Sequence, residues 1–308
     1  MSAPWLVAEV SARCELACAF CYNPWRDGRA LPDELPTVAW REVFERAIAV
    51  RRPRGVTLAG GEPLLRDDLE VLASYLSRRG LGVAVATSGV GLDRRRAEAL
   101  VRAGVQWFEI GLPTVDRDVL RELVGRDTVT DAIDGVQAAQ AAGASAALSV
   151  VLVRPVLPSL GATLDLARGL SVARVTLNRF VPGGRGARNA AALDPGDEGL
   201  AAALDVAEDR ARCGLEVHLG LPIEPCRFPV DRWPHVRAAI CACGVGKSCI
   251  DPRGRFATCE QAADAPFAGG RAAQCAACAD RHRCGGGCRA LGPLPEHHSS
   301  ARVAAGSP

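Results

Sequence analysis

The stretch Cys14-Glu-Leu-Ala-Cys18-Ala-Phe20-Cys21 decides how the rest of the chain is interpreted. Its cysteines are separated by three and then two residues, so three thiolates lie on one short loop. Such a loop can hold three irons of a four-iron, four-sulfur cluster, which normally takes four thiolates. Because no other cysteine occurs before Cys213, the fourth iron is left open for catalysis. A zinc site is the alternative, although structural zinc sites are usually closed by a fourth ligand.

A second motif, Leu58-Ala59-Gly60-Gly61-Glu62-Pro63, follows a short apolar stretch. Two consecutive glycines let a backbone pass close to a ligand and offer it N–H and C=O groups. Together with the aromatic Phe20 before the third cysteine, the loop and this motif resemble the radical SAM superfamily. The resemblance implies that Cys14, Cys18 and Cys21 hold a [4Fe–4S] cluster that binds S-adenosylmethionine (SAM). It also implies cofactor contacts from Phe20, Gly60, Gly61, Glu62 and Pro63.

The composition is typical of an intracellular enzyme. The chain has 308 residues, 48% of them hydrophobic, and a net charge of +2. It contains no basic tract of the kind that binds a phosphate backbone, so nucleic acid is not an expected partner. Residues 1–10 have neither the basic leader of a signal peptide nor the length of a membrane span. Thirteen cysteines gather towards the two ends, which indicates metal binding in a reducing compartment, here the cytoplasm.

The hydrophobic pattern alternates between strands and helices up to about residue 220. Helices between successive strands provide crossover connections, which favour a parallel sheet with ligands at the carboxyl ends of its strands. We therefore predict an α/β fold in which residues 1–220 form the partial (β/α)6 barrel that the resemblance implies. A complete eight-unit barrel is the alternative. The expected strands are 5–10, 55–59, 82–87, 106–112, 146–153 and 173–180, and the expected helices are 38–51, 67–79, 93–103, 129–142, 159–169 and a last one ending at Cys213.

Polar residues at the ends of three predicted strands are further candidates for cofactor binding. Ser88 follows the third strand, Ser149 lies on the fifth, and Arg179 ends the sixth. Serine hydroxyls can contact a ribose, and an arginine can present a planar fork to a carboxylate. A simple turn, a structural hydroxyl and a surface arginine are the respective alternatives. No catalytic acid or base is assigned.

Residues 221–308 differ in composition, being rich in cysteine and turn residues, and end in a short polar tail. The run Cys275-x2-Cys278-x5-Cys284-x3-Cys288 resembles the SPASM domain, which holds auxiliary iron–sulfur clusters in many radical SAM enzymes. A zinc ribbon is the alternative. The resemblance implies two ligand sets: Cys243, Cys249, Cys259 and Cys288 for a first auxiliary cluster, and Cys275, Cys278 and Cys284 for a second.

The fourth ligand of the second cluster is missing from its usual place, because no cysteine follows Cys288. Four possibilities stay open. The cluster has an open iron, it is bound by Cys213, Cys226 or Cys241, it is bound by His297 or His298, or it does not exist.

The resemblance implies that SAM is reductively cleaved to a 5′-deoxyadenosyl radical that removes a hydrogen atom from substrate. An auxiliary cluster then helps to oxidise or crosslink the substrate, which we expect to be a ribosomally made peptide. A dehydrogenase or epimerase of a small molecule, such as a sugar or aminoglycoside precursor, is the alternative. A third interpretation is a zinc-binding interaction module without enzymatic activity. Expected partners are an electron donor such as flavodoxin or ferredoxin and a separate peptide-recognition protein.

Overall fold

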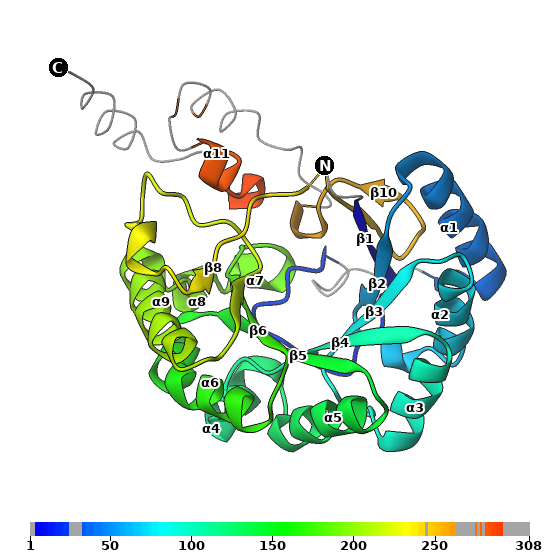
Figure 1. Ribbon diagram of the computed structural model, residues 1–308, viewed down its shortest axis with the longest axis horizontal. Helices are drawn as coiled ribbons and strands as arrows, with labels where there is room; N and C mark the ends of the chain where they lie inside the picture. The colour runs from blue at the N-terminus through cyan, green and yellow to red at the C-terminus, as the bar shows by residue number, and fades with distance from the viewer. Residues whose placement is uncertain are drawn as a thin grey trace.

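The fold is built around one ten-stranded sheet, seen in a computed structural model that describes residues 4–24, 33–243, 246–262, 275, 278 and 281–291. The strand order is β10-β9-β1-β2-β3-β4-β5-β6-β7-β8, and every neighbouring pair is parallel except β9 and β10. Figure 1 shows the strands surrounded by an outer layer of helices. The strands are β1 (Trp5–Ser11), β2 (Gly55–Gly60), β3 (Gly82–Thr87), β4 (Val105–Gly111), β5 (Ser145–Leu152), β6 (Arg174–Arg179), β7 (Val217–Leu219), β8 (Val236–Arg237), β9 (Lys247–Ile250) and β10 (Phe256–Ala257).

Helices cover the outer face of the sheet, and the hydrophobic core lies between the two layers. Trp40 and Phe44 of the first helix are fully buried, as their helical spacing predicts. The alternation of strands and helices confirms the predicted partial barrel. The helices are α1 (Thr37–Arg51), α2 (Leu69–Ser77), α3 (Arg94–Arg102), α4 (Arg117–Val124), α5 (Val129–Ala141), α6 (Leu160–Gly169), α7 (Gly184–Arg188), α8 (Ala190–Leu193), α9 (Gly196–Arg212) and α11 (Arg281–Cys284), with short 3-10 turns η2 (Pro63–Leu65), η3 (Arg154–Ser159), η4 (Val230–Arg232), η5 (Glu260–Ala262) and η6 (Arg289–Leu291).

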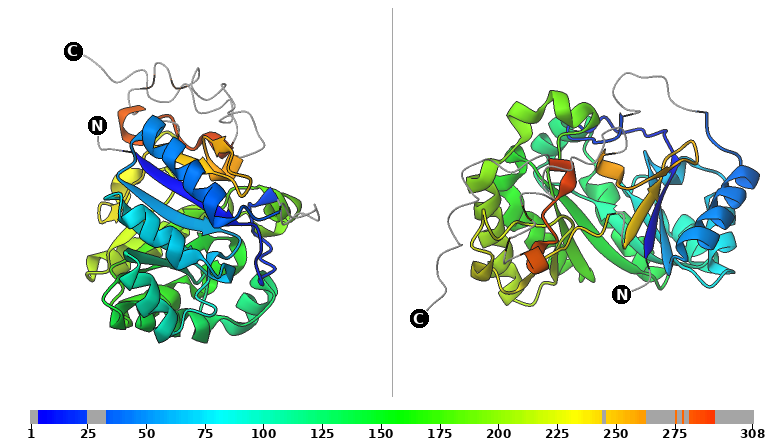
Figure 2. Two further views of the ribbon diagram at one scale, coloured as in Figure 1. Left: turned by 90° about the vertical axis from the view of Figure 1, so that its right-hand side faces the viewer. Right: turned by 90° about the horizontal axis from the view of Figure 1, so that it is seen from above.

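The cysteine-rich region contributes strands to the barrel sheet. β9 pairs in parallel with β1, and β10 returns antiparallel along β9 (Figure 2). The sheet therefore continues past residue 220, and the boundary between two domains at that position stays a prediction. Within the described part of the chain, no helix is long and apolar enough to cross a membrane.

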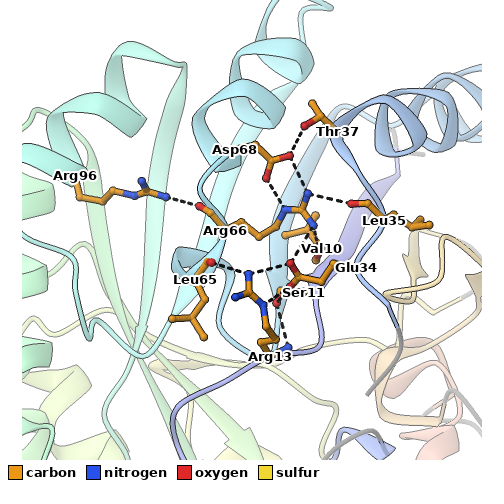
Figure 3. A network of polar contacts seen from close by, with 10 residues as sticks. All are labelled: Val10, Ser11, Arg13, Glu34, Leu35, Thr37, Leu65, Arg66, Asp68 and Arg96. Atoms are coloured by element: carbon orange, nitrogen blue, oxygen red, sulfur yellow. Dashed lines mark hydrogen bonds and ion pairs between the residues drawn. The ribbon is translucent and has the colours of Figure 1, made fainter. Parts of the chain in front are cut away.

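A polar network fixes the point where β1 ends and the cysteine loop begins (Figure 3). Arg66, which is 4% exposed, donates to the carbonyls of Val10 and Leu35 at 2.9 and 3.1 Å and pairs with Asp68 at 2.8 Å. Arg13 pairs with Glu34 at 2.9 Å. The network thus ties the end of β1 to the turn after β2 and to the start of α1, which sets the position of the cysteines that follow.

Candidate active site

Three cysteines and most of the predicted cofactor contacts line one cavity of about 190 Å³. It lies at the carboxyl ends of β2 to β5, where a parallel sheet places its ligands. Pro63 and Arg179 do not line it. Pro63 is buried at the start of η2, behind the turn that faces the cavity. The predicted residues that do line it are Cys14, Cys18, Cys21, Phe20, Gly60, Gly61, Glu62, Ser88 and Ser149.

Helix α4, which was not predicted, supports the cysteine loop from one side. The carbonyls of Leu123 and Val124, at its carboxyl end, accept hydrogen bonds from the N–H groups of Ala19 and Ala17 at 2.7 and 2.9 Å. Ala17 and Ala19 lie on either side of Cys18 in the sequence. The helix ends at Gly125 in the left-handed conformation, with φ of 87°. The unpaired carbonyls of a helix end are therefore used to hold the loop.

The segment around α7 supports the loop from the other side. Asn189 donates to the carbonyl of Ala19 at 2.9 Å, and the N–H of Gly186 donates to that of Cys21 at 3.0 Å. Arg185, which also lines the cavity, donates to the carbonyl of Cys18 at 3.1 Å. Sequence reasoning missed Arg185. Its position directly after two glycines was the available signal.

The glycine pair after β2 serves contact between two backbone segments. A Cβ atom on Gly60 would lie 2.2 Å from the carbonyl oxygen of Ser11, and one on Gly61 would lie 2.1 Å from that of Arg13. The N–H groups of Gly61 and Glu62 donate to these same two oxygens, both at 2.7 Å. Because the glycines have no side chain, the turn packs directly against the backbone that leads into the cysteine loop. Both glycines also line the cavity.

Glu62 joins this turn to the end of β3. Its carboxylate accepts from the hydroxyl of Thr87 at 2.7 Å, and from the N–H and hydroxyl of Ser88 at 2.8 and 2.7 Å. It also accepts from the N–H of Leu64 at 3.1 Å. Burial raises the pKa of Glu62, although these four hydrogen bonds favour its charged form. Ser88 thus lines the cavity, but its hydroxyl group donates its proton to Glu62. Thr87 also lines the cavity, and sequence reasoning missed it.

The donor set fits an iron–sulfur cluster. Burial, reinforced by the neighbouring Cys21 and Cys14, raises the pKa of the Cys18 thiol to about 12. Three thiolates cannot share such a site without a positive charge to stabilise them, and metal ions deprotonate coordinating thiols outright. Among the described residues that line the cavity, the only carboxylate is the fully hydrogen-bonded Glu62 and none is a histidine, so this lining offers no free fourth ligand for a four-coordinate zinc site.

A second cavity of about 820 Å³ fills the inside of the barrel. It shares Cys18, Phe20, Cys21, Ser149 and Val151 with the first cavity, so the two adjoin at the cysteine loop. Arg179 lines this larger cavity, where its guanidinium pairs with the buried Glu224 at 2.7 Å. Ser149 accepts a hydrogen bond from Asn178 at 2.9 Å.

The predicted ligands of the first auxiliary cluster are buried beside the barrel: Cys243, Cys249, Cys259 and Cys288. The sulfurs of Cys243 and Cys259 lie within 4.8 Å of each other and of a carboxylate oxygen of Glu260. Glu260 also contacts Lys247, and both line the barrel cavity. Glu260 was not predicted, and only its position next to Cys259 could have suggested it. His297 and His298 lie outside the described residues.

All thirteen cysteines lie in the described part of the chain, and none of them is in a disulfide. Cys213 is exposed at the end of α9. Cys226, Cys241 and Cys278 are half-buried, and Cys275 and Cys284 are buried.

Comparisons with known proteins show the family to which the chain belongs. The family model described as the Radical SAM superfamily matches residues 8–160. A PqqA peptide cyclase from Streptomyces rochei is 33% identical over 201 residues, which cover 64% of this chain and 54% of that protein. A PqqA peptide cyclase from Methylocella silvestris is 31% identical over 268 residues, covering 85% of this chain and 69% of that protein. The chain thus spans about half the length of the first of these relatives.

Solved structures show the same fold. SuiB of Streptococcus suis bound to its precursor peptide SuiA has a TM-score of 0.68 at 15% identity, covering 85% of this chain and 60% of SuiB. The enzyme anSMEcpe with bound AdoMet has a TM-score of 0.62 at 12% identity, covering 83% of this chain and 74% of that one. With the cysteine loop and the Gly-Gly-Glu-Pro turn facing one cavity, the chain belongs to the radical SAM superfamily, as an enzyme of the SPASM type that uses a [4Fe–4S] cluster and SAM.

Proposed function

We propose that this protein modifies a ribosomally made peptide by oxidising it or by forming a crosslink within it. The observation that carries this proposal is the barrel cavity of about 820 Å³, which adjoins the cysteine loop and is large enough for a peptide segment. The relatives support the same substrate class, because two are named peptide cyclases and SuiB has been solved with a precursor peptide.

Cys14, Cys18 and Cys21 would hold the cluster, and the smaller cavity beside them would take SAM. Together the cluster and SAM supply a carbon-centred radical that removes a hydrogen atom from the substrate. Glu62, with Thr87 and Ser88, holds the Gly-Gly-Glu-Pro turn against the cavity, so these residues position the cofactor. The orientation of the substrate and the exclusion of water depend on residues of the barrel.

The barrel residues orient the substrate and exclude water. Ser149 and Val151 line both cavities, so a substrate atom resting on them lies next to the cofactor site. Polar side chains further inside can bind peptide groups by hydrogen bonds and charge: Thr57, Glu109, Asn178, Arg179, Lys247 and Glu260. The Lys247–Glu260 pair lines the barrel cavity, and Glu260 lies close to Cys243 and Cys259, which supports a first auxiliary site at the wall of that cavity.

An auxiliary cluster held by the buried cysteines beside the barrel would supply an acceptor for the second electron of the substrate oxidation. A small electron-transfer protein, such as a flavodoxin or ferredoxin, reduces the first cluster, and a separate protein delivers the peptide. Since these clusters require a reducing compartment, we place the enzyme in the cytoplasm.

The test is an anaerobic assay of the full chain with SAM, a chemical reductant and any short peptides whose reading frames neighbour its gene. We expect 5′-deoxyadenosine to form and the peptide to lose the mass of two hydrogen atoms for each bond made. Tandem mass spectrometry would locate the modified residue. Formation of 5′-deoxyadenosine that leaves every such peptide unchanged, but converts a small sugar or amino-sugar, would overturn the peptide assignment.

A further inference from the structure

Two arginine–tryptophan pairs line the barrel cavity, and they differ in how their polar atoms are bound. The guanidinium of Arg54 lies 5.7 Å from the ring centre of Trp5, whose Nε1 donates to the hydroxyl of Thr57 at 2.7 Å. The guanidinium of Arg174 lies 4.4 Å from the ring centre of Trp107. In this second pair the Nε of Arg174 and the Nε1 of Trp107 are shielded from solvent and have no hydrogen-bond acceptor among the described residues. The protein completes the first pair but not the second.

Arg174 carries the charge of the second pair and forms no ion pair in the part of the chain that the structure describes. Glu216 lies beside β6, because its carbonyl accepts from the N–H of Val175 at 2.8 Å. Its carboxylate, however, binds His218 at 2.6 Å and Arg237 at 3.6 Å. The planar guanidinium of a half-buried arginine is best satisfied by a carboxylate, which can accept from two of its N–H groups at once. Arg174 thus presents an unneutralised cation to the barrel cavity.

An acidic side chain on the same inner face does not neutralise it. Glu109 of β4 is in register with Ala147 of β5, and Ala147 is in register with Arg174 of β6. Glu109 and Arg174 therefore stand on either side of a small residue, but the guanidinium extends over Trp107, two residues before Glu109 on β4. A carboxylate that enters the cavity is repelled by Glu109 and attracted by Arg174. The charges of the cavity thus favour one position for an anionic group.

This position is distant from the cofactor site. Trp107 precedes Gly111 by four residues on β4, and Gly111 lines the smaller cavity beside the cysteine loop. At about 3.3 Å per residue, the two positions are about 13 Å apart along the strand. A group bound by Arg174 and an atom that reacts next to the cofactor therefore belong to different parts of the substrate.

We propose that Arg174 binds a carboxylate of the substrate at the amino end of the barrel, and that the ring of Trp107 positions its guanidinium. The carboxylate is that of an acidic side chain or of a chain end, since both offer the same two oxygens. The inference rests on the proposed function in taking the substrate to be a peptide. It adds that this peptide carries a carboxylate away from the residue that is modified.

Chemical protection of the wild-type holoprotein tests the site without a substitution. Phenylglyoxal modifies accessible arginines, and mass spectrometry locates them. We expect the α-amide of acetyl-glutamate, or acetyl-alanine, to slow the modification of Arg174, whereas the neutral amides of the same compounds should not. Stronger protection by the first probe indicates a side-chain carboxylate, and stronger protection by the second indicates a chain end. Arg78, which is exposed, is the internal control and should react at one rate throughout. Equal rates at Arg174 with charged and neutral compounds would overturn the assignment.

Calorimetric titration of the protecting probe into variants separates binding from positioning. Arg174→Gln should weaken binding about tenfold or more, because it removes a charge-assisted hydrogen bond. Trp107→Ala should also weaken it, whereas Trp107→Phe keeps an aromatic face and should restore most of the affinity. Arg54→Gln, the matched control from the first pair, should bind as wild type does. Equal affinity of the Arg174 and Arg54 variants would overturn the carboxylate site, and equal loss in both Trp107 variants would overturn the positioning role of the ring.

The carboxylate site and the peptide assignment can fail separately. If wild type modifies a peptide but no probe protects Arg174, only the carboxylate site is wrong. If the probe binds through Arg174 but wild type converts only a small sugar or amino-sugar, the peptide assignment is wrong and the carboxylate site stands.

Discussion

The two cysteine-rich regions are held in different ways. The loop of Cys14, Cys18 and Cys21 is supported by backbone hydrogen bonds from α4, from the segment around α7 and from the turn after β2. Its shape is therefore set by protein contacts alone. In the described part of residues 241–291, by contrast, no helix or strand exceeds four residues, and most cysteines are buried. We therefore expect the first region to be a preformed receptor for a cluster and the second to require metal in order to fold.

Removing a thiol of the preformed loop should have the largest effect. Cys18→Ala leaves two thiolates, which cannot hold the first cluster, while the backbone contacts on both sides of residue 18 stay in place. We expect cleavage of SAM to fall to background, measured as 5′-deoxyadenosine, with the circular dichroism spectrum of the barrel unchanged. Cys213→Ala is the control and should retain full activity. Retained cleavage in the Cys18 variant would contradict the assignment of this loop.

Metal removal should separate the two regions. Chelation of all iron should expose residues 241–291 to protease, because short turns cannot bury a core of their own, while the barrel stays resistant. Limited proteolysis followed by mass spectrometry measures both. The Cys18→Ala protein, which loses only the first cluster, should keep its C-terminal region protected. Equal protease resistance of residues 241–291 with and without iron would mean that protein contacts are sufficient there too.

This difference also explains what the sequence could predict. Hydrophobic periodicity located β1 to β6, because buried parallel strands and amphipathic helices leave regular patterns. The cysteine spacing and the glycine pair identified the site residues. Helix α4 was missed although Asp116 caps it and Gly125 ends it, since the signals lie close together on a short helix. The contact between η4 and α11 could not be predicted, because the ion pair of Asp231 and Arg283 joins residues that are 52 positions apart in the sequence.

A smaller perturbation tests whether the backbone contacts shape the loop. A Cβ atom on Gly184, where φ is 48°, would lie 2.6 Å from the carbonyl oxygen of Asn23, so Gly184→Ala must displace the chain just after Cys21. We expect SAM cleavage to fall about tenfold, which corresponds to about 1.4 kcal/mol. Gly143→Ala is the matched control, because φ there is 90° and nothing lies within 4 Å. Equal activity of the two variants would show that the loop tolerates this displacement.

An effect on stability alone, and one that depends on pH, is expected from a buried carboxyl on β1, between the two cysteine-rich regions. Burial raises the pKa of Glu9 to about 8, and Glu260 and Asp251 raise it as well, although the hydroxyl of Tyr22 donates to Glu9 at 3.1 Å. Lys247 compensates Glu260, and Arg255 compensates Asp251. The folded protein therefore keeps Glu9 protonated near neutral pH, whereas the unfolded chain ionises it above about pH 4.5.

The sign of the pH dependence follows from this difference. Because the folded pKa is the higher one, the contribution of Glu9 to stability is fully present below pH 4.5 and is lost as the pH rises to about 8. The loss amounts to at most about 5 kcal/mol, at about 1.4 kcal/mol per pKa unit. Glu9→Gln keeps the shape without the charge, so its melting temperature should exceed that of wild type by more at pH 8 than at pH 5. Glu42→Gln, an exposed change on α1, should show no such trend. A constant difference between wild type and Glu9→Gln across this range would mean that Glu9 is ionised in the folded protein, with Tyr22 and its surroundings stabilising the charge.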